Sequence, residues 1–278
     1  IPREMGMISF MHATRLSSCS FVLKIAVFLV GALWLCPLAS PAAWSGTDEE
    51  FVAMVQSNNW DFFRRNQGGP FNFFRGSGLY DSEISSDSAA TCAGDGFGIA
   101  SLCVGAYRGW TSDEYAYTNI LALLRAYDTQ LQRDGNDFFN HFYGYEDGLP
   151  RAEYSVIDST WFLCGALMAA QYFKGTEVEA IANHIYDSFI YTANGPLWAA
   201  YYEFIIINIV GSGSRSNGWN AATAQSAWES CTRASPDYSH GPLFWYQWPQ
   251  VFVDFRFRTD SLGTNHYQLA MNAFLEQQ

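Results

Sequence analysis

Basic residues are scarce in this sequence. Its 278 residues include 15 lysines and arginines against 27 aspartates and glutamates, so the formal net charge is −12 at pH 7. A chain with this balance is repelled by phosphate backbones and by anionic lipid surfaces. Nucleic acid and membrane surfaces are therefore disfavoured as partners, whereas an uncharged polymer such as a glycan is compatible with the charge.

The signatures of several catalytic classes are also missing. The chain has no G-x-S-x-G, and the segment "GDGFG" lacks the preceding strand and the downstream acid of a dinucleotide site. The five histidines are scattered, and no C-x-x-C is present, so no spacing typical of metal ligands occurs. We therefore expect neither a cofactor nor a metal ion.

Long apolar runs are confined to the first 42 residues. After Met11 come a basic residue, Arg15, an apolar run over residues 21–38, and the small residues Ser40 and Ala42 at the −3 and −1 positions of a cleavage site. This order predicts residues 1–42 to be a signal peptide with upstream residues, and the mature chain to be secreted or periplasmic. An uncleaved anchor is the alternative; the short run disfavours it.

Four cysteines remain after the predicted cleavage: Cys92, Cys103, Cys164 and Cys231. Cys103 and Cys164 lie in apolar runs and are expected to be buried as small hydrophobic residues. An exported chain can form disulfides, and Cys92, in a predicted loop, is the first candidate for one.

Aromatic residues are abundant, at 17% of the chain, with 10 tryptophans and 16 tyrosines. Such side chains combine a flat apolar face with a polar group, a composition typical of carbohydrate-active proteins. The chain is 49% hydrophobic, which is ample for a sizeable core.

Two kinds of predicted helix alternate along the chain. Amphipathic helices with polar N-caps and acidic first turns are predicted over 47–66, 112–131 and 175–191. Helices that are apolar on nearly every side are predicted over residues 94–110, 155–173 and 199–211, the last closed by Gly211. A Gly- and Asn-rich loop is expected over 68–78.

This alternation predicts an all-α fold with two concentric rings of helices, an (α/α) barrel. Helices of the inner ring contact protein on both sides, and those of the outer ring on one side only. An irregular α-helical domain is the alternative, and "EFIIINIV" is also compatible with a strand.

Five stretches of the sequence resemble, in order, the glycoamylase-like family of bacterial endo-β-1,2-glucanases. They are "GDGFGIASLCVGAYRGWTSDEYA" (94–116), "FFNHFY" (138–143), "EYSVIDSTWFLCGALMAAQYF" (153–173), "YYEFIIINIVGSGS" (201–214) and "GPLFWYQWPQVFVDFR" (241–256). The resemblance implies an (α/α)6 barrel, incomplete in this chain, with residues 43–278 as a partial catalytic domain. It also implies inverting hydrolysis of β-1,2-glucan by a monomer.

Three acids are the catalytic candidates. Glu203 lies among Tyr202, Phe204 and isoleucines, where desolvation would keep its carboxyl protonated, and it matches the general acid of the resembled family. The alternative is a glutamate at an exposed helix start. Glu153 and Asp158 flank the start of a buried helix, where an acid must be paired or functional; by resemblance they line the substrate cleft. Asp158 is equally compatible with a role in capping the helix.

Candidate substrate-binding residues come from three segments. Asp81 matches a family residue near the site, although its loop is also compatible with a solvated acidic surface. Tyr202 neighbours the predicted acid. In the last stretch, Gln247 can donate to and accept from sugar hydroxyls, and tryptophan faces suit sugar rings; the residues assigned there are Trp245, Gln247, Trp248, Asp254 and Arg256. A structural ion pair between Asp254 and Arg256 below an aromatic core is the alternative.

The resemblance has three departures. The segment before residue 201 is shorter than in the family, Tyr246 and Gln250 stand where the family has histidines, and the sequence ends before the last helices of a twelve-helix barrel. We therefore expect a truncated chain that is inactive or weakly active alone. A non-catalytic glycan-binding relative and a structural helical ectodomain are the alternatives.

Overall fold

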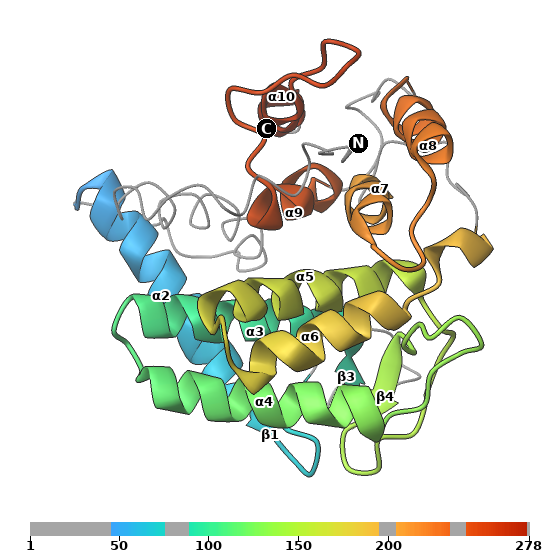
Figure 1. Cartoon of the computed structure of the whole chain (residues 1–278). Helices are drawn as coiled ribbons and strands as arrows, with labels where there is room; N and C mark the ends of the chain where they lie inside the picture. The colour runs from blue at the N-terminus through green and yellow to red at the C-terminus, as the bar shows by residue number, and fades with distance from the viewer. Residues whose placement is uncertain (1–45, 76–88, 195–203, 234–242, 277–278) are drawn as a thin grey trace.

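The computed structural model describes residues 46–75, 89–194, 204–233 and 243–276 (Figure 1). The predicted signal peptide and three of the site residues, Asp81, Tyr202 and Glu203, lie outside the described residues. No helix in the described part of the chain is long and apolar enough to cross a membrane.

Helices dominate the described structure. They are α2 (Asp48–Asn66), α3 (Cys92–Tyr107), α4 (Asp113–Thr129), α5 (Val156–Tyr172), α6 (Glu177–Ser188), α7 (Phe204–Gly213), α8 (Ala221–Arg233), α9 (Phe244–Phe252) and α10 (His266–Glu276), with a 3-10 turn at Tyr191–Asn194. Four short strands form two antiparallel pairs: β1 (Gln67–Gly68) with β2 (Phe73–Phe74), and β3 (Ala89–Thr91) with β4 (Phe142–Gly144).

Polar caps begin the helices where the sequence predicts them. The Thr47 hydroxyl accepts a hydrogen bond from the Glu50 backbone N–H, and the Glu50 carboxylate accepts one from the Thr47 N–H, which completes a capping box on α2. Ser112 caps α4 by accepting from the Tyr115 N–H. These bonds satisfy backbone donors that a helix start leaves without partners.

The predicted alternation of helices is confirmed in the packing. The largely buried helices α3, α5 and α7 follow one another in space, with α3 against α5 and α5 against α7. The amphipathic helices α4 and α6 pack on each other and cover α3 and α5 from one side, and α8 covers α7 (Figure 1). An inner and an outer layer result.

Two glycines allow the inner helices to touch through their backbones. A Cβ atom added to Gly165 of α5 would lie 2.0 Å from the carbonyl oxygen of Gly96 in α3. A Cβ atom on Gly96 would lie 2.4 Å from the carbonyl oxygen of Trp161. The small residues of these apolar stretches therefore set the distance between α3 and α5.

Three details differ from the sequence-based expectations. Part of the expected loop at 68–78 is the hairpin of β1 and β2, in which Gln67 pairs with Phe74. The "EFIIINIV" segment is helical from Phe204, as predicted, but α7 ends at Gly213, two residues later than predicted. Cys92 is not in a loop: it is the buried first residue of α3.

The cysteine thiols of the described core form no disulfide. Cys92, Cys103 and Cys164 are buried and free, which confirms the expected burial of Cys103 and Cys164 and is contrary to a disulfide at Cys92. Burial raises the pKa of all three thiols, so they stay protonated and behave as small apolar side chains.

Candidate active site

Three segments meet at the N-terminal end of α5. β4 pairs with β3, which leads directly into α3, so the residues just before β4 lie beside the start of α3. The His141 carbonyl accepts from the Cys92 N–H at 3.0 Å, and the His141 N–H donates to the Glu153 carbonyl at 2.8 Å. The backbone therefore holds His141 between the start of α3 and the segment that enters α5.

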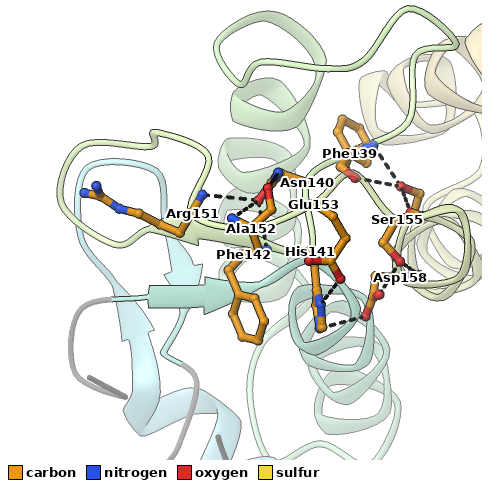
Figure 2. Close-up of polar contacts among 10 residues, drawn as sticks. Phe139, Asn140, His141, Phe142, Arg151, Ala152, Glu153, Ser155 and Asp158 are labelled. Atoms are coloured by element: carbon orange, nitrogen blue, oxygen red, sulfur yellow. Dashed lines mark hydrogen bonds and ion pairs between the residues drawn. The ribbon is translucent and has the colours of Figure 1, made fainter. Parts of the chain in front are cut away.

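Asn140 fixes that entering segment from within. Its side chain is completely buried, and its Oδ1 atom accepts from the backbone N–H groups of Phe142, Arg151 and Ala152. Its Nδ2 atom donates to the Ala152 carbonyl (Figure 2). The side-chain amide of Asn140 thus satisfies four backbone groups. Because two of these groups belong to Ala152, it also sets the position of the next residue, Glu153.

Ser159 fixes the start of α5 in the same way. Its buried hydroxyl accepts from the Phe139 N–H at 2.8 Å and donates to the Ser155 carbonyl at 2.6 Å. The Ser155 N–H in turn donates to the Phe139 carbonyl at 2.9 Å. The first turn of α5 is therefore tied to the segment that carries His141.

These supports bring Glu153 and Asp158 to the two edges of one imidazole ring. The distance from His141 Nδ1 to Glu153 Oε1 is 3.0 Å, and that from His141 Nε2 to Asp158 Oδ1 is 3.6 Å (Figure 2). The exposed fraction of the side chain is 71% for Glu153, 26% for His141 and 15% for Asp158. All three thus have contact with solvent, Glu153 most and Asp158 least.

The two carboxyl groups have opposite electrostatic environments. Hydrogen bonds from its own backbone N–H and from His141 lower the pKa of Glu153. Burial raises the pKa of Asp158, against the opposing effects of His141 and Ser155. Glu153 is therefore ionised more readily than Asp158.

Asp158 also has the capping role that the sequence left open. The Ser155 hydroxyl is the N-cap of α5: it accepts from the Asp158 N–H at 3.2 Å and donates to the Asp158 Oδ2 atom. The other carboxylate oxygen, Oδ1, faces His141. Asp158 can therefore help to cap α5 and face His141 at the same time, because each contact uses a different carboxylate oxygen.

The predicted substrate-binding residues near the end of the chain have mixed positions. Trp248 packs against the core, with ring centroids 5.3 Å from Phe97 and 5.8 Å from Trp161. Trp245 and Gln247 are half-buried on α9. Asp254 and Arg256 form an ion pair with each other, Oδ1 to Nε at 2.9 Å, which is the alternative given by the sequence.

Tyr246 and Gln250, at the two positions where the resembled family has histidines, are both buried. Gln250 donates to the His266 carbonyl at 2.9 Å, and Tyr246 packs in a small core between α9 and α10. Both side chains therefore support α10.

His141 is the functional candidate that the sequence did not single out. It is 12 residues from Glu153, and no periodic pattern relates it to Asp158 in the next helix. The resemblance included its segment, "FFNHFY", but only the fold places the ring between the two acids. No group of three His, Cys, Asp or Glu side chains within the described ranges is arranged to hold a metal ion.

No protein-family model and no curated protein matches this chain. Several solved structures, however, are similar to this chain. A candidate glucoamylase from Bacteroides uniformis superposes with a TM-score of 0.71 at 17% identity, over 84% of this chain and 66% of the other. An endo-β-1,2-glucanase from Chitinophaga pinensis, in complex with sophorotriose and glucose, gives 0.70 at 18% identity, over 83% and 66%.

A β-1,2-glucanase from Parabacteroides distasonis has a TM-score of 0.68 at 14% identity, over 82% of this chain and 40% of its own. The chain thus covers just under two thirds of the first two proteins. These likenesses confirm the predicted fold: the described helices form part of a glucoamylase-like (α/α) barrel.

Proposed function

We propose that this chain is the catalytic domain, or part of it, of a glycoside hydrolase that cleaves β-1,2-linked glucan with inversion. The observation that carries the proposal is the pair of carboxyl groups, Glu153 and Asp158, at the N-terminal end of the inner helix α5. It is supported by the fold shared with an endo-β-1,2-glucanase that binds sophorotriose.

Inverting hydrolysis needs an acid that protonates the glycosidic oxygen and a base that takes a proton from water, with carboxyl groups about 6.5–9.5 Å apart. We assign the acid to Glu203. Glu153 suits the base, because its lowered pKa keeps it ionised and its exposure admits water. Asp158, beside it, would orient the sugar or the water.

We assign substrate binding to the residues that the sequence indicates. Trp245 and Gln247 keep partly exposed surfaces on α9, which suit a sugar face and sugar hydroxyls. Asp81 and Tyr202 remain assigned through the resemblance, and Trp248, Asp254 and Arg256 stay predictions. We also propose export with cleavage after Ala42, which N-terminal sequencing of the mature chain would test.

The direct test is an assay of the full 278-residue chain on β-1,2-glucan, with released sophoro-oligosaccharides as the product. We expect slow release that Glu203→Gln abolishes and that Glu153→Gln lowers by roughly 100-fold or more, the usual contribution of a general base. Glu177→Gln is the control, since Glu177 pairs with Arg125 on the exposed surface of α6.

Calorimetry with sophorotriose accompanies the assay. Binding without hydrolysis, unchanged in Glu203→Gln, would indicate the glycan-binding alternative. The absence of both binding and hydrolysis would contradict the proposal.

A further inference from the structure

His141 contacts both acids through different ring nitrogens. Its Nδ1 atom is within hydrogen-bond distance of Glu153, and its Nε2 atom is at ion-pair distance from Asp158. A neutral imidazole has one N–H and one lone pair, so it can donate to only one of these carboxylates. A protonated imidazole donates on both sides, and only this form is attractive to two ionised carboxylates at once.

Backbone hydrogen bonds fix the position of the residue that carries the ring. The His141 N–H and carbonyl both bond to neighbouring segments, and the completely buried Asn140 fixes the chain beside it. The side chain itself is partly exposed, and its ring nitrogens lie beside the two carboxyl groups.

We propose that His141 is a positioning residue of this site: its imidazole lies between the two carboxyl groups, holds Glu153 in place and favours the ionised form of Asp158. The effect of His141 on hydrolysis rests on the proposed function, whereas its effect on the ionisation of Asp158 does not. The charge of the site thus depends on the side chain between the two acids.

The other titratable groups that face this cluster do not substitute for His141. Among the described residues, Glu153 approaches from the segment before α5, and Cys92 lies at the start of α3 within electrostatic reach of Asp158. Burial raises the pKa of the Cys92 thiol well above its usual range, so the thiol stays neutral. Glu153 is an anion that opposes ionisation of Asp158. His141 is the group that favours it through charge.

The test is a titration of the Asp158 side chain by carbon-detected NMR on protein labelled at aspartate carboxyl carbons, with Asp158→Asn to assign the resonance. In His141→Gln, which keeps an amide donor but no titratable ring, we expect the midpoint of Asp158 to lie at higher pH than in the unaltered protein. An unchanged midpoint would overturn the proposal. His184→Gln is the matched control, because His184 pairs with Asp128 on the exposed side of α6.

Two further readouts separate the possible failures. In the unaltered protein the Asp158 resonance should titrate in two steps rather than one, because interacting groups titrate together. This measurement tests the interaction between His141 and Asp158 even if His141→Gln does not fold. A single step would contradict that interaction.

Where hydrolysis is measurable, His141→Gln should lower kcat/KM by about 100-fold and move one limb of the pH profile to higher pH. If the chain does not hydrolyse glucan but the Asp158 midpoint moves, the proposed function fails and this inference stands.

Discussion

Asp95 is a buried acid with a structural role that differs from that of the site acids. It lies in the first turn of α3 and is completely buried. Its carboxyl accepts from the Tyr127 hydroxyl at 2.6 Å and from the Phe74 N–H at 2.7 Å. It thereby joins α3, α4 and β2 at one point, and burial raises its pKa to about 8.

We predict that this carboxyl makes the stability of the fold depend on pH. Because its pKa rises from an ordinary value near 4 to about 8 on folding, the folded state retains a proton that the unfolded state loses. Its contribution to stability is complete below about pH 4 and declines as the pH rises towards 8. Tyr127 and Cys92, which face it, are kept neutral over this range by burial.

Asp95→Asn, which preserves the shape of the group, should remove this decline. Urea unfolding midpoints at pH 5 and pH 8 measure it: the unaltered chain should lose stability between the two, and the variant should lose less. Asp113→Asn serves as the control, since Asp113 also accepts from a tyrosine hydroxyl, that of Tyr172, but on the exposed surface. Equal losses in all three proteins would refute the assignment.

At the scale of helices, Gly96 and Gly165 allow the backbones of α3 and α5 to approach closely. We predict that Gly165→Ala destabilises the chain by about 1–3 kcal/mol or more, because the new methyl group would overlap the Gly96 carbonyl and force the helices apart. Thermal melts followed by circular dichroism measure the effect.

Gly135→Ala is the matched control for this substitution. Gly135 has no atom within 4 Å of its added Cβ and has no positive φ. A melting temperature lowered as much in Gly135→Ala as in Gly165→Ala would show that the loss comes from glycine replacement in general.

The helices were predictable because their signals are local. A cap such as Thr47 or Ser112 and an apolar repeat lie within one stretch of chain, and the structure confirms both. The hairpin of β1 and β2 was not predictable, since strands of two residues are too short for an alternating pattern. Cys92 was misplaced because β3 and α3 adjoin without the loop that the small residues indicated.

The candidate site was predictable only in part for the same reason. Glu153 and Asp158 were identified from sequence because acids at the start of an apolar helix are costly to bury without a partner. Their partner His141 was not, because its contacts depend on the pairing of β3 with β4 and on the buried amide of Asn140. These are tertiary contacts, which no single stretch encodes.

At the scale of the whole molecule, the described chain has two cores of unequal size. The larger one lies between α3, α4, α5 and α6, and the smaller one holds α9 and α10 together around Tyr246, Phe255 and Ala270. Trp248 is a link from α9 to the larger core, because it packs on Phe97 of α3 and Trp161 of α5. A helix held by a few side chains on a small core opens more easily than a central one.

We therefore predict that Trp248→Ala releases α9 and α10 without unfolding α3 and α5. Removal of such a side chain costs about 3–5 kcal/mol, which corresponds to an increase in opening of roughly 100-fold or more. Hydrogen exchange followed by mass spectrometry should show faster exchange over 244–252 and 266–276 and unchanged exchange over 156–172. Trp110→Ala, which removes a ring packed on Trp60, is the control and should accelerate exchange near α2 only. Uniform acceleration in Trp248→Ala would mean that the two cores unfold as one unit, and that the residues of α9 assigned to sugar binding are held as rigidly as Asp158 of α5.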